Sequence, residues 1–496
     1  MSPRKGTSLK ILFVSTEAVP YAQVGGLGEV ISALPKSLRA MGHDARVFMP
    51  KYLSISRKRY KFTPVMEGLQ LGKPANDPHN LTVSNVLRHR KADGATTYFL
   101  ENMEFYEKRA NVYGYADDTA RWLLLCRGVL EFLRRSEWTP DVIIANDWPA
   151  GFLPNLMETE YRNDPVLSRI ATVYMIHNLK NQGMFDVHFV ADSNYDWGTS
   201  PLPDIFDIAK VKLLNGMRRG IIYADTIGVV SPTYAKEILE PELGERLNDL
   251  LNKRKDRLVG ILNGIDYKKY NPATDRGITR KYSNKRLSGR AENKRALQRI
   301  FKLPQRRDAF LMGFVGRLDE QKGIKLFMNV AKPVLENLDI QFVLVGTGDK
   351  DYRMFFKELE EEYPEQVSTH LFFSQKLPKR IFAGADALLM PSRFEPAGLV
   401  QMEAMHYGCV PVVRNTGGLA DTVKDDTVGN PGTGFVFGDY EAMAMLIAIV
   451  RAAAAFRDKR RWDGIVRRAM REDFSWDASA SAHARLYRQA IRHHKK

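Results

Sequence analysis

The first candidates for chemistry are Glu395 and the turn Thr416-Gly417-Gly418, which follow two apolar segments at residues 387–390 and 410–413. The pattern predicts two buried strands joined by a helix over about residues 398–407. In a parallel unit of this kind both loops lie at the carboxyl ends of the strands, where open α/β sheets bind ligands. We therefore expect Glu395 and the backbone N–H groups from Thr416 to Leu419 to face one site, with the N–H groups directed at an anion.

Two cations follow a third predicted strand, at residues 310–315. Arg317 and Lys322 flank a tight turn that precedes a helix. An arginine can bind a phosphate through two N–H groups and a lysine acts as a point charge, so this pair beside a helix N-terminus predicts a diphosphate site. The alternative is that both are ordinary surface charges.

A glycine loop near the N-terminus has a similar setting. A predicted strand at residues 10–15 leads through Gln23, Gly25 and Gly26 into an amphipathic helix that ends near Gly42. A strand, a glycine loop and a helix N-terminus together form a phosphate cradle. The spacing is not the GxGxxG of dinucleotide folds, so by itself it identifies no particular nucleotide.

Polar residues also end two other buried strands. Asp147 follows residues 142–146, and His177 follows residues 172–176. Asp147 could be the N-cap of the helix that begins near Ala150, and a lone histidine is usually structural. From the residues alone, these structural interpretations stay open beside a role in a site.

Length and charge limit the function classes. A chain of 496 residues suggests two or three domains. The formal net charge of +16 could indicate nucleic acid, an anionic surface or a phosphorylated substrate. The basic residues are scattered and not interleaved with aromatic residues, so nucleic acid is not expected as the main partner. Cys126 and Cys409 lie in apolar contexts, which favours buried thiols over a disulfide or a zinc site.

Membrane and export signals are not expected. No apolar run reaches the roughly 18 residues of a membrane span, and residues 1–6 contain no signal-peptide core. We therefore expect a cytoplasmic protein with no membrane partner.

Two runs carry a family resemblance. Residues 391–399 (Pro-Ser-Arg-Phe-Glu-Pro-Ala-Gly-Leu) and 415–421 (Asn-Thr-Gly-Gly-Leu-Ala-Asp) resemble the nucleotide-sugar segment of bacterial glycogen synthases and plant starch synthases, and similar stretches extend from Phe13 to Tyr487. The resemblance implies an α/β protein of the GT-B architecture, with two Rossmann-like domains facing across a deep cleft. We expect an acceptor-side domain at residues 1–265, a nucleotide-sugar domain at 266–473 and a terminal helix at 474–496 that crosses back to the first domain.

The same resemblance implies an activity. It predicts a retaining hexosyltransferase that transfers glucose from a nucleotide diphosphate glucose, ADP-glucose by preference, to the non-reducing end of an α-1,4-glucan. No cofactor and no metal are expected, and Asp349 and Asp351 are interpreted as a chance match to a DxD metal motif. The sequence predicts neither the acceptor length nor an oligomeric state.

Residue roles also follow from the resemblance. The catalytic candidates are Asp147 and His177 near the sugar, Arg317 and Lys322 at the leaving diphosphate, and Glu395 at the sugar hydroxyls. The candidates for donor binding are Gln23, Gly25, Gly26, Asn263, Thr416, Gly417, Gly418 and Leu419. The family carries a lysine at the position of Gln23, so this chain lacks a cation there.

Two alternatives remain open. One is a retaining glucosyltransferase that uses UDP-glucose or another acceptor. The other is a non-catalytic relative that binds glycan or nucleotide, which Gln23 and Asn181 favour because both replace residues usual in the family.

Overall fold

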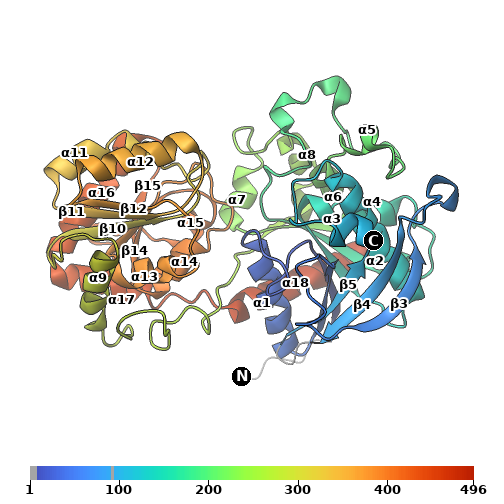
Figure 1. Cartoon of the computed structure of the whole chain (residues 1–496), viewed down its shortest axis with the longest axis horizontal. Coiled ribbons are helices and arrows are strands. Elements are labelled where there is room, and N and C mark those ends of the chain that lie inside the picture. Colours follow the sequence, from blue (N-terminus) through green and yellow to red (C-terminus); the bar gives the residue numbers. More distant parts are fainter. Residues whose placement is uncertain (1–7, 91–93, 496) are drawn as a thin grey trace. The chain divides into compact units, whose positions relative to one another are not determined.

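The chain forms two compact units. The structure, a computed structural model, describes residues 8–90 and 94–495, so residues 1–6, on which the expectation about an export signal rests, lie outside the described part. Unit 1 comprises the chain up to Gly264 together with the segment from Trp476 onward, and unit 2 comprises Ile265–Ser475 (Figure 1). Each unit has its own sheet with helices packed on it.

Unit 1 contains a nine-stranded mixed sheet in the order β3-β4-β5-β2-β1-β6-β7-β8-β9. The pairs from β5 through β2 and β1 to β9 are parallel, whereas β3–β4 and β4–β5 are antiparallel. Its central strands are continuous apolar runs because helices cover both faces of a parallel sheet. The strands are β1 (Lys10–Val14), β2 (Asp44–Pro50), β3 (Thr63–Gln70), β4 (Val83–Arg90), β5 (Thr96–Glu101), β6 (Val142–Asn146), β7 (Ala171–Ile176), β8 (Thr226–Val229) and β9 (Leu258–Gly260).

The helices of unit 1 connect these strands and cover the sheet. They are α1 (Leu27–Ala40), α2 (Asp118–Arg135), α3 (Asp147–Ala150), α4 (Phe152–Glu158), α5 (Ile208–Val211), α6 (Gly216–Tyr223), α7 (Pro232–Glu237), α8 (Asn248–Lys253) and α18 (Trp476–His494). Short helical turns lie at Pro74–Asn76, Met103–Glu107, Leu167–Arg169, Val187–Phe189, Asp192–Asn194 and Lys255–Arg257.

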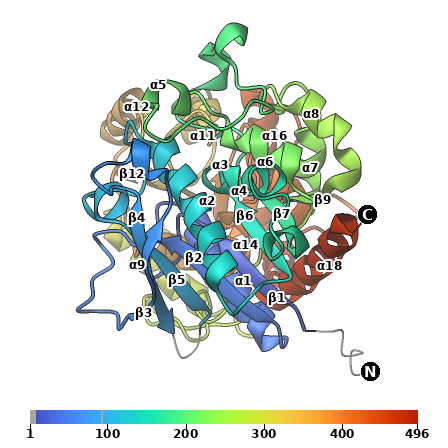
Figure 2. The ribbon, with the colours of Figure 1, turned by 90° about the vertical axis from the view of Figure 1, so that its right-hand side faces the viewer.

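The C-terminal helix α18 is part of unit 1. It packs against α1 and strands β6, β7 and β8, and Figure 2 shows it beside α1 although the two lie near opposite ends of the chain. The ring of Tyr487 lies edge-on to Phe13, with centroids 6.2 Å apart. The Ser479 hydroxyl donates to the Leu262 carbonyl at 2.7 Å. The last residues of the chain therefore complete the core of the first unit.

Unit 2 contains a six-stranded parallel sheet in the order β12-β11-β10-β13-β14-β15. Counted within the unit, the strand order is 3-2-1-4-5-6, which is the order of a Rossmann sheet. Successive strands are added on one side of β10 up to β12 and on the other side from β13 onward, so the strand order reverses between β10 and β13. Helices α11 and α12 lie along one face and α9 and α13 along the other (Figure 1). The strands are β10 (Phe310–Val315), β11 (Ile340–Val345), β12 (Val367–His370), β13 (Ala387–Met390), β14 (Val410–Arg414) and β15 (Phe435–Phe437), and the helices are α9 (Gly289–Ile300), α10 (Lys325–Met328), α11 (Ala331–Asn337), α12 (Lys350–Glu362), α13 (Leu377–Gly384), α14 (Val400–His406), α15 (Gly417–Thr422), α16 (Ala442–Arg457) and α17 (Lys459–Ala469).

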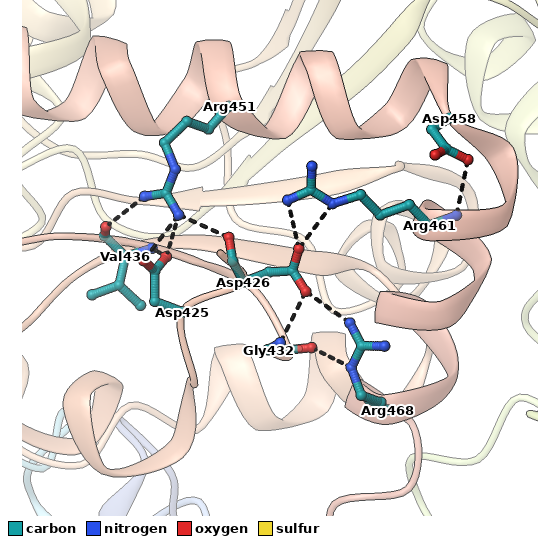
Figure 3. Close-up of polar contacts among 8 residues, drawn as sticks. All are labelled: Asp425, Asp426, Gly432, Val436, Arg451, Asp458, Arg461 and Arg468. Atoms are coloured by element: carbon teal, nitrogen blue, oxygen red, sulfur yellow. Dashed lines mark hydrogen bonds and ion pairs between the residues drawn. The ribbon is translucent and has the colours of Figure 1, made fainter. Parts of the chain in front are cut away.

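A group of paired charges fixes helices α16 and α17 to the loop before β15 (Figure 3). The buried carboxylate of Asp426 accepts hydrogen bonds from Arg461, from Arg468 and from the Gly432 N–H, at 2.8–3.1 Å. Arg451 contacts Asp425 at 2.9 Å. Each of these arginines thus has a carboxylate partner.

Some local predictions are confirmed and others are wrong. Cys126 and Cys409 are buried free thiols, as expected. The sequence of residues 371–373 predicts a strand, but the strand β12 lies before it and ends at His370. The sequence of residues 212–224 predicts a helix, but α6 begins only at Gly216, because the Asn215 side chain caps it by accepting from the Arg218 N–H. In the part of the chain that the structure describes, no helix has the length and apolar character needed to cross a bilayer.

Candidate active site

Lys322 and Glu395 meet at the point where the sheet of unit 2 reverses its order. Lys322 follows β10 and Glu395 follows β13, and the Lys322 Nζ lies 2.7 Å from Glu395 Oε2. The Ser392 hydroxyl donates to the same carboxylate oxygen at 2.9 Å. The Glu395 side chain is only 8% exposed, so the lysine supplies the counter-charge that a buried carboxylate requires. Ligands of open α/β sheets bind at this reversal.

The turn at residues 416–418 packs directly against the Glu395 loop. The Gly418 N–H donates to the Glu395 carbonyl at 2.9 Å. A Cβ at Gly417 would lie 2.0 Å from that carbonyl oxygen, and one at Gly418 would lie 1.8 Å from the Ala397 carbonyl oxygen. Only glycine permits this approach, so the prediction that the two loops lie together is confirmed.

The N–H groups of this turn do not point freely at a ligand. The N–H of Thr416 donates to Arg414, that of Gly418 to Glu395 and that of Leu419 to Thr416. The prediction that these N–H groups are open donors for an anion is therefore wrong, because they donate to backbone carbonyl groups of the turn itself and of the Glu395 loop. Within the described residues the buried Thr416 hydroxyl oxygen has no hydrogen-bond partner, so it is a polar atom that a ligand can satisfy.

Arg317 lies in a more exposed position than Lys322. Its guanidinium contacts Asp319 at 3.1 Å and donates to Gln321 at 3.3 Å, and its side chain is 65% exposed. The Lys322 N–H in turn donates to Asp319 at 3.0 Å. Asp319 thus organises the turn that carries both cations, and Arg317 keeps donor groups for an anion.

Asp147, Asn146 and His177 form a connected group in unit 1, at the ends of β6 and β7. Asp147 Oδ1 accepts from the backbone N–H of His177 at 2.8 Å and from that of Asn178 at 3.4 Å. It therefore ties one strand end to the next and does not cap its own helix α3, so the N-cap interpretation is wrong. Its φ of 53° is left-handed, an uncommon conformation for a residue with a side chain.

The protonation states of this group follow from its surroundings. Burial raises the pKa of Asp147, and because this effect is larger than the lowering by the N–H groups of His177 and Asn178, the pKa is about 7. Burial lowers the pKa of His177 to about 3. His177 is therefore neutral at neutral pH. The Asn146 amide nitrogen donates to the carbonyls of Val14 and Ile144, which leaves its oxygen to accept from His177 Nε2 at 2.9 Å. This arrangement places the proton on Nε2 and leaves Nδ1 as an acceptor.

Glu17 organises the glycine loop and was not predicted as a site residue. Its buried carboxylate accepts from the N–H of Val24 at 2.5 Å, from that of Gly25 at 2.9 Å and from the Tyr113 hydroxyl at 2.9 Å. The Gly25 N–H is thus occupied by a carboxylate, and the prediction that it is free for a phosphate is wrong here. Gln23 is exposed and donates to Glu29 at 3.3 Å.

Asn146 and Ser392 are further residues of the candidate site that were not predicted from the sequence. They position His177 and Glu395. Asn146 is the last residue of the buried strand β6, and Glu17 and Ser392 follow buried strands within two or three residues. That position was the available signal, but it does not identify the bonding partner. Asn263, which was predicted, is buried in unit 1, and within the described part its Oδ1 has no hydrogen-bond partner.

Comparisons with known proteins decide the family. Residues 10–253 match the model of the starch synthase catalytic domain, and residues 297–460 match that of glycosyl transferases group 1. A glycogen synthase of Geotalea daltonii is 40% identical, over 97% of this chain and 99% of that protein. The chain belongs to the glycogen and starch synthase family.

Further members of the family agree. The glycogen synthase of Thermotoga maritima is also 40% identical, over 97% of this chain and 99% of the relative. The catalytic domain of starch synthase IV from Arabidopsis thaliana, solved with ADP and acarbose, has a TM-score of 0.83 and 29% identity, covering 98% of this chain and 100% of that one. The predicted α/β fold of the GT-B class, with two Rossmann-like domains, is confirmed for this synthase.

Proposed function

We propose that this chain is a retaining glucosyltransferase that extends an α-1,4-glucan with glucose from ADP-glucose. The family assignment supports the glucan synthase activity and, with it, a nucleotide-sugar donor and a glucan acceptor. The observation that carries the proposal for the site is the convergence of Lys322, Glu395 and the Thr416 turn at the sheet reversal of unit 2. The choice of ADP-glucose over UDP-glucose as the donor is our inference from the family.

Unit 2 has the charges that departure of a nucleoside diphosphate requires. Lys322 Nζ is a point charge beside the reversal, and the exposed guanidinium of Arg317 follows the same strand. Cations placed where negative charge develops stabilise the transition state. Glu395 then binds sugar hydroxyls as an acceptor, and Lys322 holds its buried carboxylate in place at 2.7 Å.

Unit 1 has groups suited to a sugar with developing positive charge. His177 is neutral, so it adds no cation where an oxocarbenium-like centre forms, and its Nδ1 can accept from a hydroxyl. Asp147, with a pKa of about 7, holds the His177 backbone through Oδ1 and thereby fixes the position of the ring. We assign Asp147 as a positioning residue on this geometry.

The predicted donor-binding residues Gln23, Asn263 and Thr416 are retained as part of the proposal, without the Gly25 and Gly418 N–H groups, which are occupied. Thr416 and Asn263 each have a buried oxygen without a partner among the described residues, which suits hydrogen bonds to the donor. Gln23 can donate a neutral hydrogen bond from the loop that Glu17 holds. Metal independence and a cytoplasmic location remain predictions.

A donor comparison tests the function. The full chain is assayed for glucose transfer from ADP-, UDP- and GDP-glucose, with glycogen and without it, and the product is digested to establish α-1,4 linkage. We expect glycogen-dependent transfer that is fastest with ADP-glucose. Faster transfer from UDP-glucose would establish the alternative donor, and glycogen binding without transfer from any donor would establish a non-catalytic relative.

A further inference from the structure

Unit 2 has a cavity, away from the candidate active site, that is lined by arginines. It has a volume of about 470 Å³, and its lining residues include Arg276, Arg299 of α9 and Arg380 of α13. None of its lining residues belongs to the candidate active site. Three cationic groups from separate segments of the chain therefore share one cavity.

Among the residues that the structure describes, the three guanidinium groups have no carboxylate partner. The lining of the cavity contains no acidic residue, and in the described part of the chain Arg276, Arg299 and Arg380 form no ion pair. The arginines of Figure 3 are different, since each of them contacts Asp425 or Asp426. Positive charge concentrated in a concave site attracts anions.

The nearest carboxylate in the sequence is already engaged. Asp275 accepts from the Tyr407 hydroxyl and, at 2.7 Å, from the Gly277 N–H, and it lies 3.4 Å from Lys379 Nζ. Burial raises the pKa of Asp275, but these hydrogen bonds and the charge of Lys379 outweigh burial and lower it. Its negative charge is therefore balanced by Lys379 and does not offset the three arginines.

The frame of the cavity is held by hydrogen bonds. The side-chain oxygen of Asn293 accepts from the N–H groups of Thr279 and Arg280, at 2.9 and 3.1 Å, which attaches the loop to α9. Arg380 Nε donates to the Gly277 carbonyl at 3.3 Å, which joins the loop to α13. The arginines are thus carried by segments that are fixed to one another.

We propose that this cavity binds the phosphate group of a small phosphorylated metabolite. Guanidinium groups bind phosphate oxygens through paired N–H donors, and three of them match a dianionic phosphate monoester. The cavity volume also leaves room for a sugar attached to the phosphate, beside Thr279 and the apolar side chains of Ile278 and Ile300. This site is additional to the donor site and does not depend on the proposed function.

Calorimetric titration of the full chain tests the proposal. The probes are inorganic phosphate, glucose 1-phosphate and, as the neutral reference, glucose. We expect saturable binding of both phosphorylated probes, with one equivalent retained in Lys322→Ala, which removes one of the two donor-site cations, and no binding of glucose at this cavity. Tighter binding of glucose 1-phosphate than of phosphate identifies a sugar phosphate as the ligand, and equal binding identifies phosphate itself.

A matched pair of variants locates the binding. Arg299→Gln and Arg295→Gln remove the same charge from exposed positions of α9, but only Arg299 lines the cavity. We expect Arg299→Gln to weaken binding at least tenfold and Arg295→Gln to change it less than twofold, with Arg276→Gln as a second variant outside the helix. No binding to the parent chain, equal loss in both helix variants, or binding of a short RNA but of neither probe would overturn the proposal.

Discussion

Replacing Asp147 by asparagine tests the account of the unit 1 group directly. Asparagine is among the few residues that accept a left-handed backbone, so the φ of 53° is retained, and its side-chain oxygen can still accept from the His177 N–H. The substitution therefore removes mainly the titratable proton. We expect Asp147→Asn to be more stable than the parent chain at pH 8 and to lose that advantage as the pH falls to 4.

The magnitude follows from the pKa of Asp147. It is raised from 3.8 to about 7 in the folded chain, a difference of about 3 units. Each unit corresponds to roughly 1.4 kcal/mol, so ionisation lowers the folding stability by up to about 4 kcal/mol above pH 7. Because the folded pKa is the higher one, the stabilisation is complete below pH 4 and is lost as the pH rises through 7.

Asp147→Asn has to be compared with the parent chain at each pH, because His177 changes the folding stability with pH in the opposite direction. Its pKa is lowered to about 3, so its contribution is present above pH 6.5 and is lost as the pH falls. The parent chain alone would show the sum of both effects. The difference between Asp147→Asn and the parent isolates the carboxyl group.

Tryptophan fluorescence during urea unfolding measures this difference, from pH 4 to pH 8. Five of the six tryptophans lie in unit 1, and Trp148 is adjacent to the substitution, so the signal reports mainly on that unit. Asp249→Asn, an exposed position in α8, serves as the control for removing one carboxylate. A stability difference for Asp147→Asn that stays constant within about 0.5 kcal/mol across this range would refute the reasoning.

Three further predictions concern the synthase activity. Lys322→Ala should lower kcat/KM for the donor by roughly 100- to 1,000-fold, because it removes a cation beside the leaving diphosphate. As the control, Lys325→Ala, at an exposed neighbouring position, should change kcat/KM less than about threefold. A loss below about tenfold for Lys322→Ala in steady-state assays would show that this lysine is not part of the site. Gln23→Lys should lower the donor KM by roughly tenfold, since a charged hydrogen bond contributes about 1.4 kcal/mol more than a neutral one, and abolished activity would show that another cation occupies the place of the family lysine. Activity should persist in excess EDTA, because Lys322 and Arg317 carry the charge of a metal, and complete loss restored by manganese would instead implicate Asp349 and Asp351.

The sequence by itself determined which loops carry the chemistry. Apolar runs ending in polar residues predicted strands whose carboxyl ends hold Asp147, His177, Lys322 and Glu395, and the strands lie there. That inference works because a buried parallel strand must be apolar throughout, so its end is visible as a change of composition. The sequence also predicted that the turn with Gly417 and Gly418 lies beside the Glu395 loop. The structure explains why glycine occupies these positions, since a side chain there would collide with the carbonyl groups of that loop.

Only the tertiary structure decided which partners these residues take. The sequence did not reveal that Glu17 occupies the Gly25 N–H, that the turn at 416–419 uses its own N–H groups, or that Asp147 bonds to His177 rather than to its own helix. It also did not show that Arg276, Arg299 and Arg380 line one cavity. Hydrogen bonds and ion pairs join segments that are distant in the chain, and local composition reports how a segment folds but not which distant group it meets.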